Sequence, residues 1–125
     1  MNLHLTEKLP WAQRQSLVDE PGIYVISKGS DVVYIGRTWS ANGLRGRISQ
    51  FNRSATTGQE GHAGGVTFFG TYGALNEAEM SVAVHVPSVV RREVEILRSY
   101  IQYAERRLIW EFVERHARLP ACNSE

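Results

Sequence analysis

The sequence predicts a small α/β (α+β) domain, in which a three-stranded, mainly antiparallel sheet is flanked by helices. Two neighbouring runs rich in β-branched and aromatic residues are separated by a short turn, as in a β-hairpin. A third run, residues 80–86, alternates valine with small or polar residues, which is the period of a strand. Two other segments repeat apolar residues every three or four positions, which is the period of a helix.

Length and composition fit one folded domain. The chain has 125 residues, of which 42% are apolar and 22% are charged, and these values are typical of a globular protein with one core. They exclude a collagen-like or disordered chain. We expect residues 1–20 to form an N-terminal helical extension and residues 21–125 to form the domain itself.

The N-terminal residues and the cysteine usage bear on the setting of the protein. The first fifteen residues contain no continuous apolar run, so we expect neither a signal peptide nor a membrane span there. The single cysteine, Cys122, cannot form a disulfide within the chain, and no Cys/His cluster has the spacing of a zinc site. We therefore expect a reducing, cytoplasmic (intracellular) setting.

Residues 8–19 are expected to form a short helix, because Leu9 and Leu17 supply an apolar face and Pro10 suits a first helical turn. A hairpin follows, with strands at 23–27 and 32–36.

Each strand of this hairpin carries a tyrosine, Tyr24 and Tyr34. Directly paired residues lie on the same face of a sheet, so the tyrosines share a face only when paired residue numbers add to an even sum. A two-residue turn pairs residue 28 with 31 and sends them to opposite faces. A three-residue loop pairs 28 with 32 and puts them together. The sequence permits both.

A helix is expected from about residue 43 to 54, with its apolar face on Leu44, Ile48 and Phe51. We expect a glycine-rich loop at 56–65 and extended chain at 66–72. The third strand, residues 80–86, ends at Pro87, which cannot donate to a sheet.

Residues 88–118 are expected to be helical, in one piece or two, and Pro120 ends the segment. Its apolar stripe consists of Val94, Leu97, Ile101, Ala104, Leu108, Ile109 and Phe112.

Glu105 lies within this apolar stripe and is therefore expected to face inward. An unpaired carboxylate there costs several kcal/mol, roughly, so it requires a cation. That cation is either an arginine, in a structural ion pair, or a metal ion, and the sequence leaves both open. Glu111 and Glu114 flank the stripe and are expected to be solvated.

The segment from Lys28 to Arg53 is basic. It contains five cationic residues opposed only by Asp31, although the whole chain has a net charge of +1. Such a patch attracts phosphate, and a solvated cationic surface is the alternative. Arg47 lies beside the helix stripe, from where a guanidinium can reach a phosphate, or else is an ordinary exposed arginine.

The tripeptides Gly-Ile-Tyr at 22–24 and Tyr-Ile-Gly at 34–36 resemble the GIY-YIG nuclease family. Residues 43–51, GLRGRISQF, resemble the family's helix with its arginine, here Arg47. Further matching features follow in order along the chain. They are Glu105 with the apolar pair Leu108-Ile109, then Pro120 and Asn123, so that the resemblance covers residues 21–123.

The resemblance implies a small α/β domain that hydrolyses DNA phosphodiester bonds with one divalent ion, Mg²⁺ or Mn²⁺. By position, Tyr24 would be the general base or assist it, and Tyr34 would position water or phosphate. Arg47 would hold the scissile phosphate and Glu105 would ligate the metal. An oxygen ligand suits Mg²⁺, which also keeps waters and substrate oxygens.

The remaining site residues are supporting ones. Gly22 and Gly36 belong to the motif, and Asn123 resembles the family's supporting asparagine. Tyrosine has an ordinary pKa of about 10, so Tyr24 as a base needs cations that lower its pKa. Arg37, directly after the second tripeptide, and Arg47 are the candidates.

The sequence departs from the family pattern at two points. Phe51 stands where a histidine or tyrosine is common, which shifts weight onto Tyr24 and onto His62 in the glycine-rich loop. Glu105 precedes Asn123 by 18 residues, longer than is common, whereas Glu111 precedes it by 12. Glu105 is preferred because it lies on the buried face and is followed by the apolar pair.

These features predict an endonuclease that is almost all catalytic domain and acts on duplex or branched DNA. With no separate recognition domain in the chain, a homodimer or a larger assembly is an open alternative. The other function considered is a catalytically inactive module on the same fold that binds nucleic acid or protein. Phe51 and the long last helix favour that alternative.

Overall fold

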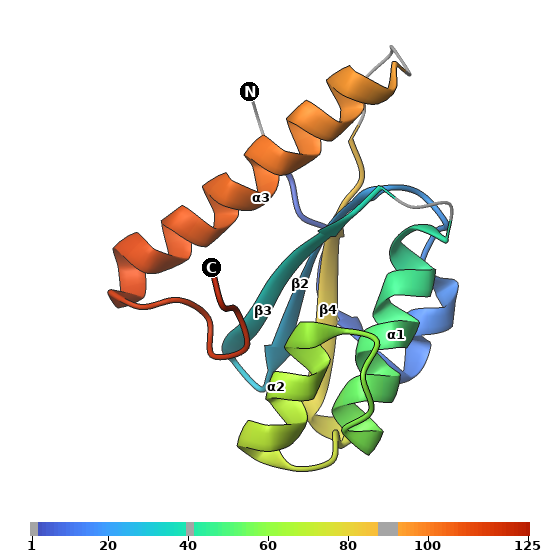
Figure 1. The fold of residues 1–125 in the computed structure, drawn as a ribbon, viewed down its shortest axis with the longest axis vertical. Coiled ribbons are helices and arrows are strands. Elements are labelled where there is room, and N and C mark those ends of the chain that lie inside the picture. The colour runs from blue at the N-terminus through green and yellow to red at the C-terminus, as the bar shows by residue number, and fades with distance from the viewer. Residues whose placement is uncertain (1–2, 40–41, 88–92) are drawn as a thin grey trace.

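The computed structural model describes residues 3–39, 42–87 and 93–125. Its elements, in chain order, are β1 (Leu9–Pro10), η1 (Trp11–Ser16), β2 (Gly22–Lys28), β3 (Asp31–Thr38), α1 (Gly43–Thr57), α2 (Ala63–Tyr72), η2 (Glu77–Glu79), β4 (Met80–His85) and α3 (Val94–His116). The strands form one antiparallel sheet in the order β1-β4-β2-β3 (Figure 1). The α+β class is therefore confirmed.

The expected number of three strands was wrong, because the two-residue strand β1 adds a fourth. Leu9 pairs with Val82 along the outer side of β4, in a stretch too short to show a period. The helix expected at 8–19 is a short 3₁₀ helix, η1. Its first residue, Trp11, is completely buried, and the indole nitrogen donates a hydrogen bond of 2.8 Å to Asn52 on α1. Anchoring this indole holds the N-terminal segment against the core.

The hairpin of β2 and β3 combines features of the two registers that the sequence permitted. Its turn has two residues, since Lys28 pairs with Asp31, and this register would separate the tyrosines. A β-bulge at Val33 then shifts the pairing, so that Tyr34 pairs with Ile26 and Tyr24 with Gly36. Both tyrosines therefore lie on the same face of the sheet.

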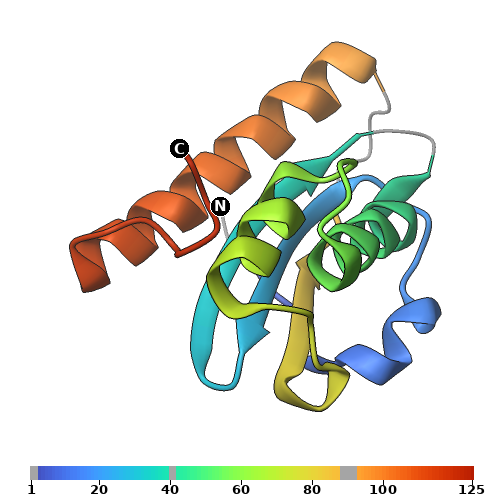
Figure 2. The same cartoon turned by 60° about the horizontal axis from the view of Figure 1, so that its bottom comes forward.

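Helices cover both faces of the sheet, which makes three layers. Tyr24, Ile26 and Val33 face α1 and α2, where they pack with Leu44, Ile48, Phe51, Ala55 and Phe68. The alternate residues Ile23, Val25 and Ile35 face α3, where they pack with Ile101, Ala104, Ile109 and Phe112. The turned view shows α3 crossing one side of the sheet, with α1 and α2 on the other (Figure 2).

The extended chain expected at 66–72 was wrong, because these residues belong to α2. The expected loop at 56–65 is also shorter, since α1 continues to Thr57 and α2 begins at Ala63. Gly65 of α2 packs directly on α1, and Gly64 packs on the Tyr34 ring; apolar periodicity does not register glycine. Residues 66–72 are therefore helical because α2 packs closely on α1 at Gly65. Their β-branched and aromatic side chains, which favour a strand, do not prevent this.

Replacing Gly65 with alanine is expected to lower the free energy of unfolding by about 1–3 kcal/mol, because the site is overpacked. A Cβ there would lie 2.8 Å from the carbonyl oxygen of Phe51 and 2.7 Å from the Cβ of Ser54, so α1 and α2 must separate. The matched control is Gly70→Ala on the same helix. A Cβ at Gly70 meets nothing within 4 Å, and the change should stabilise by about 0.5–1 kcal/mol. Chemical denaturation measures both, and equal effects of the two substitutions would contradict this packing.

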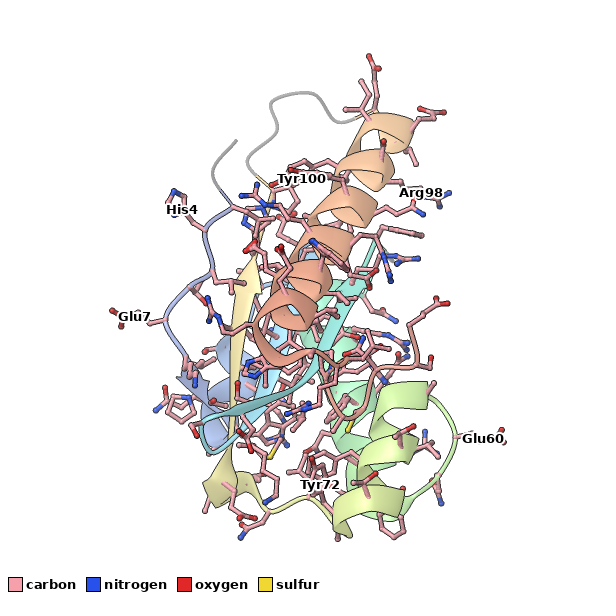
Figure 3. All side chains as sticks on the ribbon, turned by 90° about the vertical axis from the view of Figure 1, so that its left-hand side faces the viewer. His4, Glu7, Glu60, Tyr72, Arg98 and Tyr100 are labelled. Atoms are coloured by element: carbon pink, nitrogen blue, oxygen red, sulfur yellow. The ribbon has the colours of Figure 1, made fainter. Side chains whose placement is uncertain are left out.

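The third strand expected at 80–86 is confirmed as β4, and the last helix is confirmed as α3, which begins at Val94 and ends at His116, two residues before the expected end. Residues 88–92 of the expected helix lie outside the described residues. Val94 was wrongly assigned to the buried stripe, since it is 57% exposed. The first turns of α3 project beyond the sheet, while Tyr100 reaches back to His85 and Arg98 extends from the other side (Figure 3).

Among the described residues, no helix has both the length and the apolar character needed to cross a membrane.

Candidate active site

A groove of about 320 Å³ lies along the edge strand β3, where side chains from both faces of the sheet meet. It is lined by Tyr34, Arg37, Arg47, Ala63, Gly64, Thr67, Glu105, Arg106, Cys122, Asn123, Ser124 and Glu125. The C-terminal tail forms one wall and lies between α3 and α2 (Figure 2). Five segments that are distant in sequence therefore contribute to one groove.

Glu105 faces inward, as its position in the apolar stripe predicts, and is only 7% exposed. It forms an ion pair with Arg37 of β3, which is the structural partner that the sequence left open. Burial raises the pKa of the Glu105 carboxyl, and the Arg37 guanidinium opposes that rise. The same guanidinium stacks on Trp39, 5.0 Å from its ring centroid. A buried carboxylate thus meets an arginine that is oriented from two sides.

The donor atoms in this groove determine which metal site it can build. Within residues 3–39, 42–87 and 93–125, no three His, Cys, Asp or Glu side chains gather closely enough to cage a metal ion. Mg²⁺ is commonly bound by one or two carboxylates, with water and substrate phosphate as the other ligands. Glu105 fits that kind of site, and Glu125 is a second carboxylate on the wall of the same groove.

Glu111, the other glutamate considered for this role, lies away from the groove. Its side chain is about half exposed and forms an ion pair of 3.5 Å with Arg107, one turn earlier on α3. It lines a separate pocket near Phe112. The helical geometry of α3 therefore brings Glu105, and not Glu111, to the candidate site.

Arg47 projects from α1 into the groove. Its Nη1 donates to the side-chain oxygen of Gln50 at 2.6 Å and to the carbonyl oxygen of Gly61 at 3.2 Å. These two acceptors hold the guanidinium beside Tyr34 on the same wall. An arginine held in this way presents its remaining N–H groups as a fork suited to a phosphate.

The two tyrosines differ in access to the groove. Tyr34 is partly exposed and lines it, whereas Tyr24 is completely buried behind it, with ring centroids 5.9 Å apart. Glycines make room for the Tyr34 ring: a Cβ at Gly36 would lie 2.5 Å from it, and one at Gly64 the same distance. Tyr34 is therefore the tyrosine that a bound substrate meets.

The pKa of Tyr24 is raised, whereas a tyrosine that acts as a base needs a lowered pKa. Burial raises the pKa of Tyr24 well above its ordinary value, and Tyr34 raises it further, while Arg47 opposes both. Burial also raises the pKa of Tyr34, against the opposing effect of Arg47. Arg47 lowers the pKa of Tyr24, but the loss of hydration outweighs this guanidinium, so the condition for Tyr24 to act as a base is not met.

His62 is buried at the N-terminus of α2 and is only 1% exposed, although the sequence suggested a loop. Its backbone N–H donates to the hydroxyl of Ser54 at 3.0 Å. Its Nε2 lies 2.7 Å from the Tyr24 hydroxyl, and its ring centroid lies 5.0 Å from that of Phe51. The imidazole thus lies beside Phe51. Phe51 cannot transfer protons, and His62 was considered in its place for that reason.

Burial, followed by the positive charge of Arg47, lowers the pKa of His62 to about 3. The ordinary value of 6.5 applies when the chain is unfolded, so the unfolded chain binds more protons between pH 3 and 6.5. The free energy of unfolding should therefore fall as pH drops through this window.

His62→Asn is expected to reduce this acid sensitivity, since asparagine does not titrate and is a good helix N-cap. Between pH 6.5 and 4, the wild type should lose stability faster than the variant by up to about 1.4 kcal/mol per pH unit. Urea denaturation at several pH values measures the difference. Identical slopes would show that His62 does not titrate with a depressed pKa.

Asn123 and Gly22 support the site structurally and are not assigned a part in its chemistry. The Asn123 side chain accepts from the N–H of Ile35 and donates to its carbonyl oxygen, both at 2.9 Å. This double hydrogen bond fastens the C-terminal tail to β3 directly beside Tyr34. Gly22 permits close contact of β2 with β4, because a Cβ there would lie 2.4 Å from the carbonyl oxygen of His85.

Reasoning from the sequence missed several contributors to the site, among them Glu125, Arg106 and Ser54. Arg106 lines the groove beside Glu105, and its place directly after that inward residue was an available signal. Ser54 anchors His62 through its hydroxyl, and no local pattern marks it.

No protein-family model, no curated protein and no solved structure matches this chain.

Proposed function

We propose that this protein is a divalent-metal-dependent endonuclease that hydrolyses DNA phosphodiester bonds. The observation that carries the proposal is the groove shared by Tyr34, Arg47 and Glu105, side chains of three separate elements. These are a hydroxyl, a guanidinium and a buried carboxylate, which are groups suited to water, to phosphate and to a hard cation. The resemblance of residues 21–123 to the GIY-YIG nuclease family assigns these same residues to its site.

Arg47 would bind the scissile phosphate and stabilise the negative charge that builds on its oxygens during attack by water. Its anchoring by Gln50 and Gly61 supports this role, since a guanidinium held in place needs less reorganisation during the reaction. Tyr34, which lines the same groove, would receive or orient the attacking water.

Glu105 would hold one Mg²⁺ or Mn²⁺ ion, with waters and phosphate oxygens as further ligands. When bound, such an ion supplies Lewis-acid stabilisation of the phosphate oxygens. Arg37, which pairs with this carboxylate, would then turn its guanidinium toward the phosphate. A second pocket shares Arg37 and Arg47 with the groove and extends to Trp39, which gives a DNA strand a cationic path beyond the scissile bond.

Incubation with supercoiled plasmid and with branched duplexes tests the proposal. Nicked or linear products should form with Mg²⁺ or Mn²⁺ and should disappear when EDTA is added to the same preparation. Absence of cleavage on duplex, branched and single-stranded DNA, with both metals, refutes the endonuclease.

The alternative is an inactive module on this fold that binds nucleic acid or protein. The ion pair of Arg37 with Glu105 favours it, because that guanidinium occupies the carboxylate a metal needs. This alternative predicts that the protein shifts labelled DNA in a mobility-shift assay to the same extent with and without metal, and that no cleavage product forms.

A further inference from the structure

The hydrogen bonds of His62 determine which of its ring nitrogens carries the proton. Nδ1 accepts a hydrogen bond of 3.2 Å from the backbone N–H of Gly65, so it carries no proton. A neutral imidazole then has its proton on Nε2. Nε2 lies 2.7 Å from the Tyr24 hydroxyl oxygen and is therefore the donor in that contact. The depressed pKa of His62, about 3, agrees with a neutral ring near neutral pH.

The Tyr24 hydroxyl oxygen accepts this hydrogen bond, so its own proton is directed elsewhere. The groups that act on it from the other elements are Tyr34 of β3 and Arg47 of α1. A guanidinium offers only donors, which leaves the Tyr34 hydroxyl as the acceptor. The two tyrosine rings pack together with centroids 5.9 Å apart, and burial and then Tyr34 raise the pKa of Tyr24, so that Tyr24 keeps its proton beside Tyr34.

The positions of the rings give this chain of donors a direction. A Cβ at Gly36 would lie 2.6 Å from the Tyr24 hydroxyl and 2.5 Å from the Tyr34 ring. The Tyr24 hydroxyl therefore lies close to the side of the Tyr34 ring. Tyr24 itself does not line the groove, whereas Tyr34 does. A hydrogen bond from the buried imidazole to Tyr24, followed by the contact of Tyr24 with Tyr34, therefore leads outward to the groove.

We propose that His62 is a positioning residue, a fixed hydrogen-bond donor that turns the Tyr24 proton toward Tyr34 and makes Tyr34 the tyrosine that acts on the substrate. This rests on the proposed endonuclease function. It reverses the order that the family resemblance implies, in which Tyr24 activates water. It also excludes His62 as a proton acceptor for Tyr24, because the nitrogen that faces Tyr24 already carries a proton.

Two substitutions of His62 separate this role from its structural role as the N-cap of α2. Asparagine keeps an acceptor where Nδ1 stands and caps the helix, but it does not reach Tyr24. Glutamine extends an amide N–H₂ to the place of Nε2 and keeps a donor to Tyr24. His62→Asn should lower kcat by about 10- to 100-fold with KM unchanged, because it removes the hydrogen bond that orients Tyr24 beside the acting Tyr34. His62→Gln should cut at least about tenfold faster than His62→Asn, although it lacks the cap. Equal rates, or a slower glutamine variant, overturn the proposal.

The tyrosines provide a second comparison. Tyr34→Phe should lower kcat by more than Tyr24→Phe, since only Tyr34 meets the substrate. The opposite ranking, with Tyr24→Phe the more damaging, overturns the assignment and restores Tyr24 as the acting hydroxyl.

A spectroscopic readout distinguishes failure of this inference from failure of the proposed function. In a ¹H–¹⁵N spectrum of the full chain, the His62 signals, identified by their absence in His62→Asn, should show a protonated Nε2 and a bare Nδ1 from pH 6 to 8. A proton on Nδ1, or a charged ring, overturns the donor role even if the protein cuts DNA. If the wild type cuts no DNA, the endonuclease is refuted, and this spectrum alone supports or overturns the donor role.

Discussion

Glu105→Gln is expected to reduce metal-dependent DNA cleavage by about a thousandfold or more while the protein stays folded. The carboxylate supplies the negative charge that holds the cation. A bound metal stabilises the transition state by roughly several kcal/mol, so losing it should slow cleavage by about a thousandfold or more. Glutamine keeps the size of the side chain and a carbonyl oxygen that can accept from Arg37, so the buried position remains filled. Single-turnover cleavage measures the rate, and calorimetric titration with Mn²⁺ measures the loss of binding.

The matched control is Glu111→Gln, which removes the same charge from an exposed position on the same helix. Its cleavage rate should stay within about twofold of the wild type, since an exposed ion pair contributes little. A full rate in Glu105→Gln together with a low rate in Glu111→Gln would move the metal to Glu111. If both variants cleave like the wild type, neither glutamate is the ligand.

Arg47→Ala is expected to lower the cleavage rate by about 100- to 1000-fold. Removing one preorganised donor from a developing oxyanion has an effect of this size in other enzymes. Lysine at this position should restore only part of the rate, because an ammonium does not reproduce the planar fork that a phosphate accepts. DNA binding by this variant should also depend less on salt. The slope of the logarithm of the binding constant against the logarithm of salt concentration should be smaller by about one.

Arg53→Ala is the control for this prediction, since Arg53 lies on the same helix but is exposed, and it bonds to Gln59. It removes an equal charge from the basic segment without touching the groove. If the two arginine variants lose rate equally, general attraction of DNA explains the effect and Arg47 has no special role. Thermal unfolding of both proteins verifies that α1 remains intact.

Much of the fold was predictable because local patterns determine it. The hairpin strands follow from runs of β-branched and aromatic residues around a turn, β4 follows from a period-two run, and the first helix follows from a period-3.6 run of apolar residues. The same reasoning predicted that Glu105 faces inward, since a helix turns each residue by a known angle. It failed at Val94, which shares the stripe but lies where α3 projects beyond the sheet. A period identifies a face of a helix, but not how far its partner extends.

The helix α2 illustrates what local patterns omit. Valine, threonine, phenylalanine and tyrosine in residues 66–72 favour a strand by their intrinsic preference, yet they are helical here. Contact of Gly65 with the backbone of α1, together with the His62 cap, offsets that preference. Both interactions join segments that become neighbours only in the folded chain.

The sequence by itself determined the chemical groups of the candidate site: two tyrosines, an arginine beside an apolar helix face, and a carboxylate turned inward. The tertiary structure alone decided how these groups meet. The bulge at Val33 puts Tyr24 and Tyr34 on one face of the sheet. The packing of α2 places His62 within hydrogen-bond distance of Tyr24. The ion pair of Arg37 with Glu105 spans 68 positions of the chain. These contacts depend on hydrogen-bond register and on packing across layers, which no period within a single element specifies.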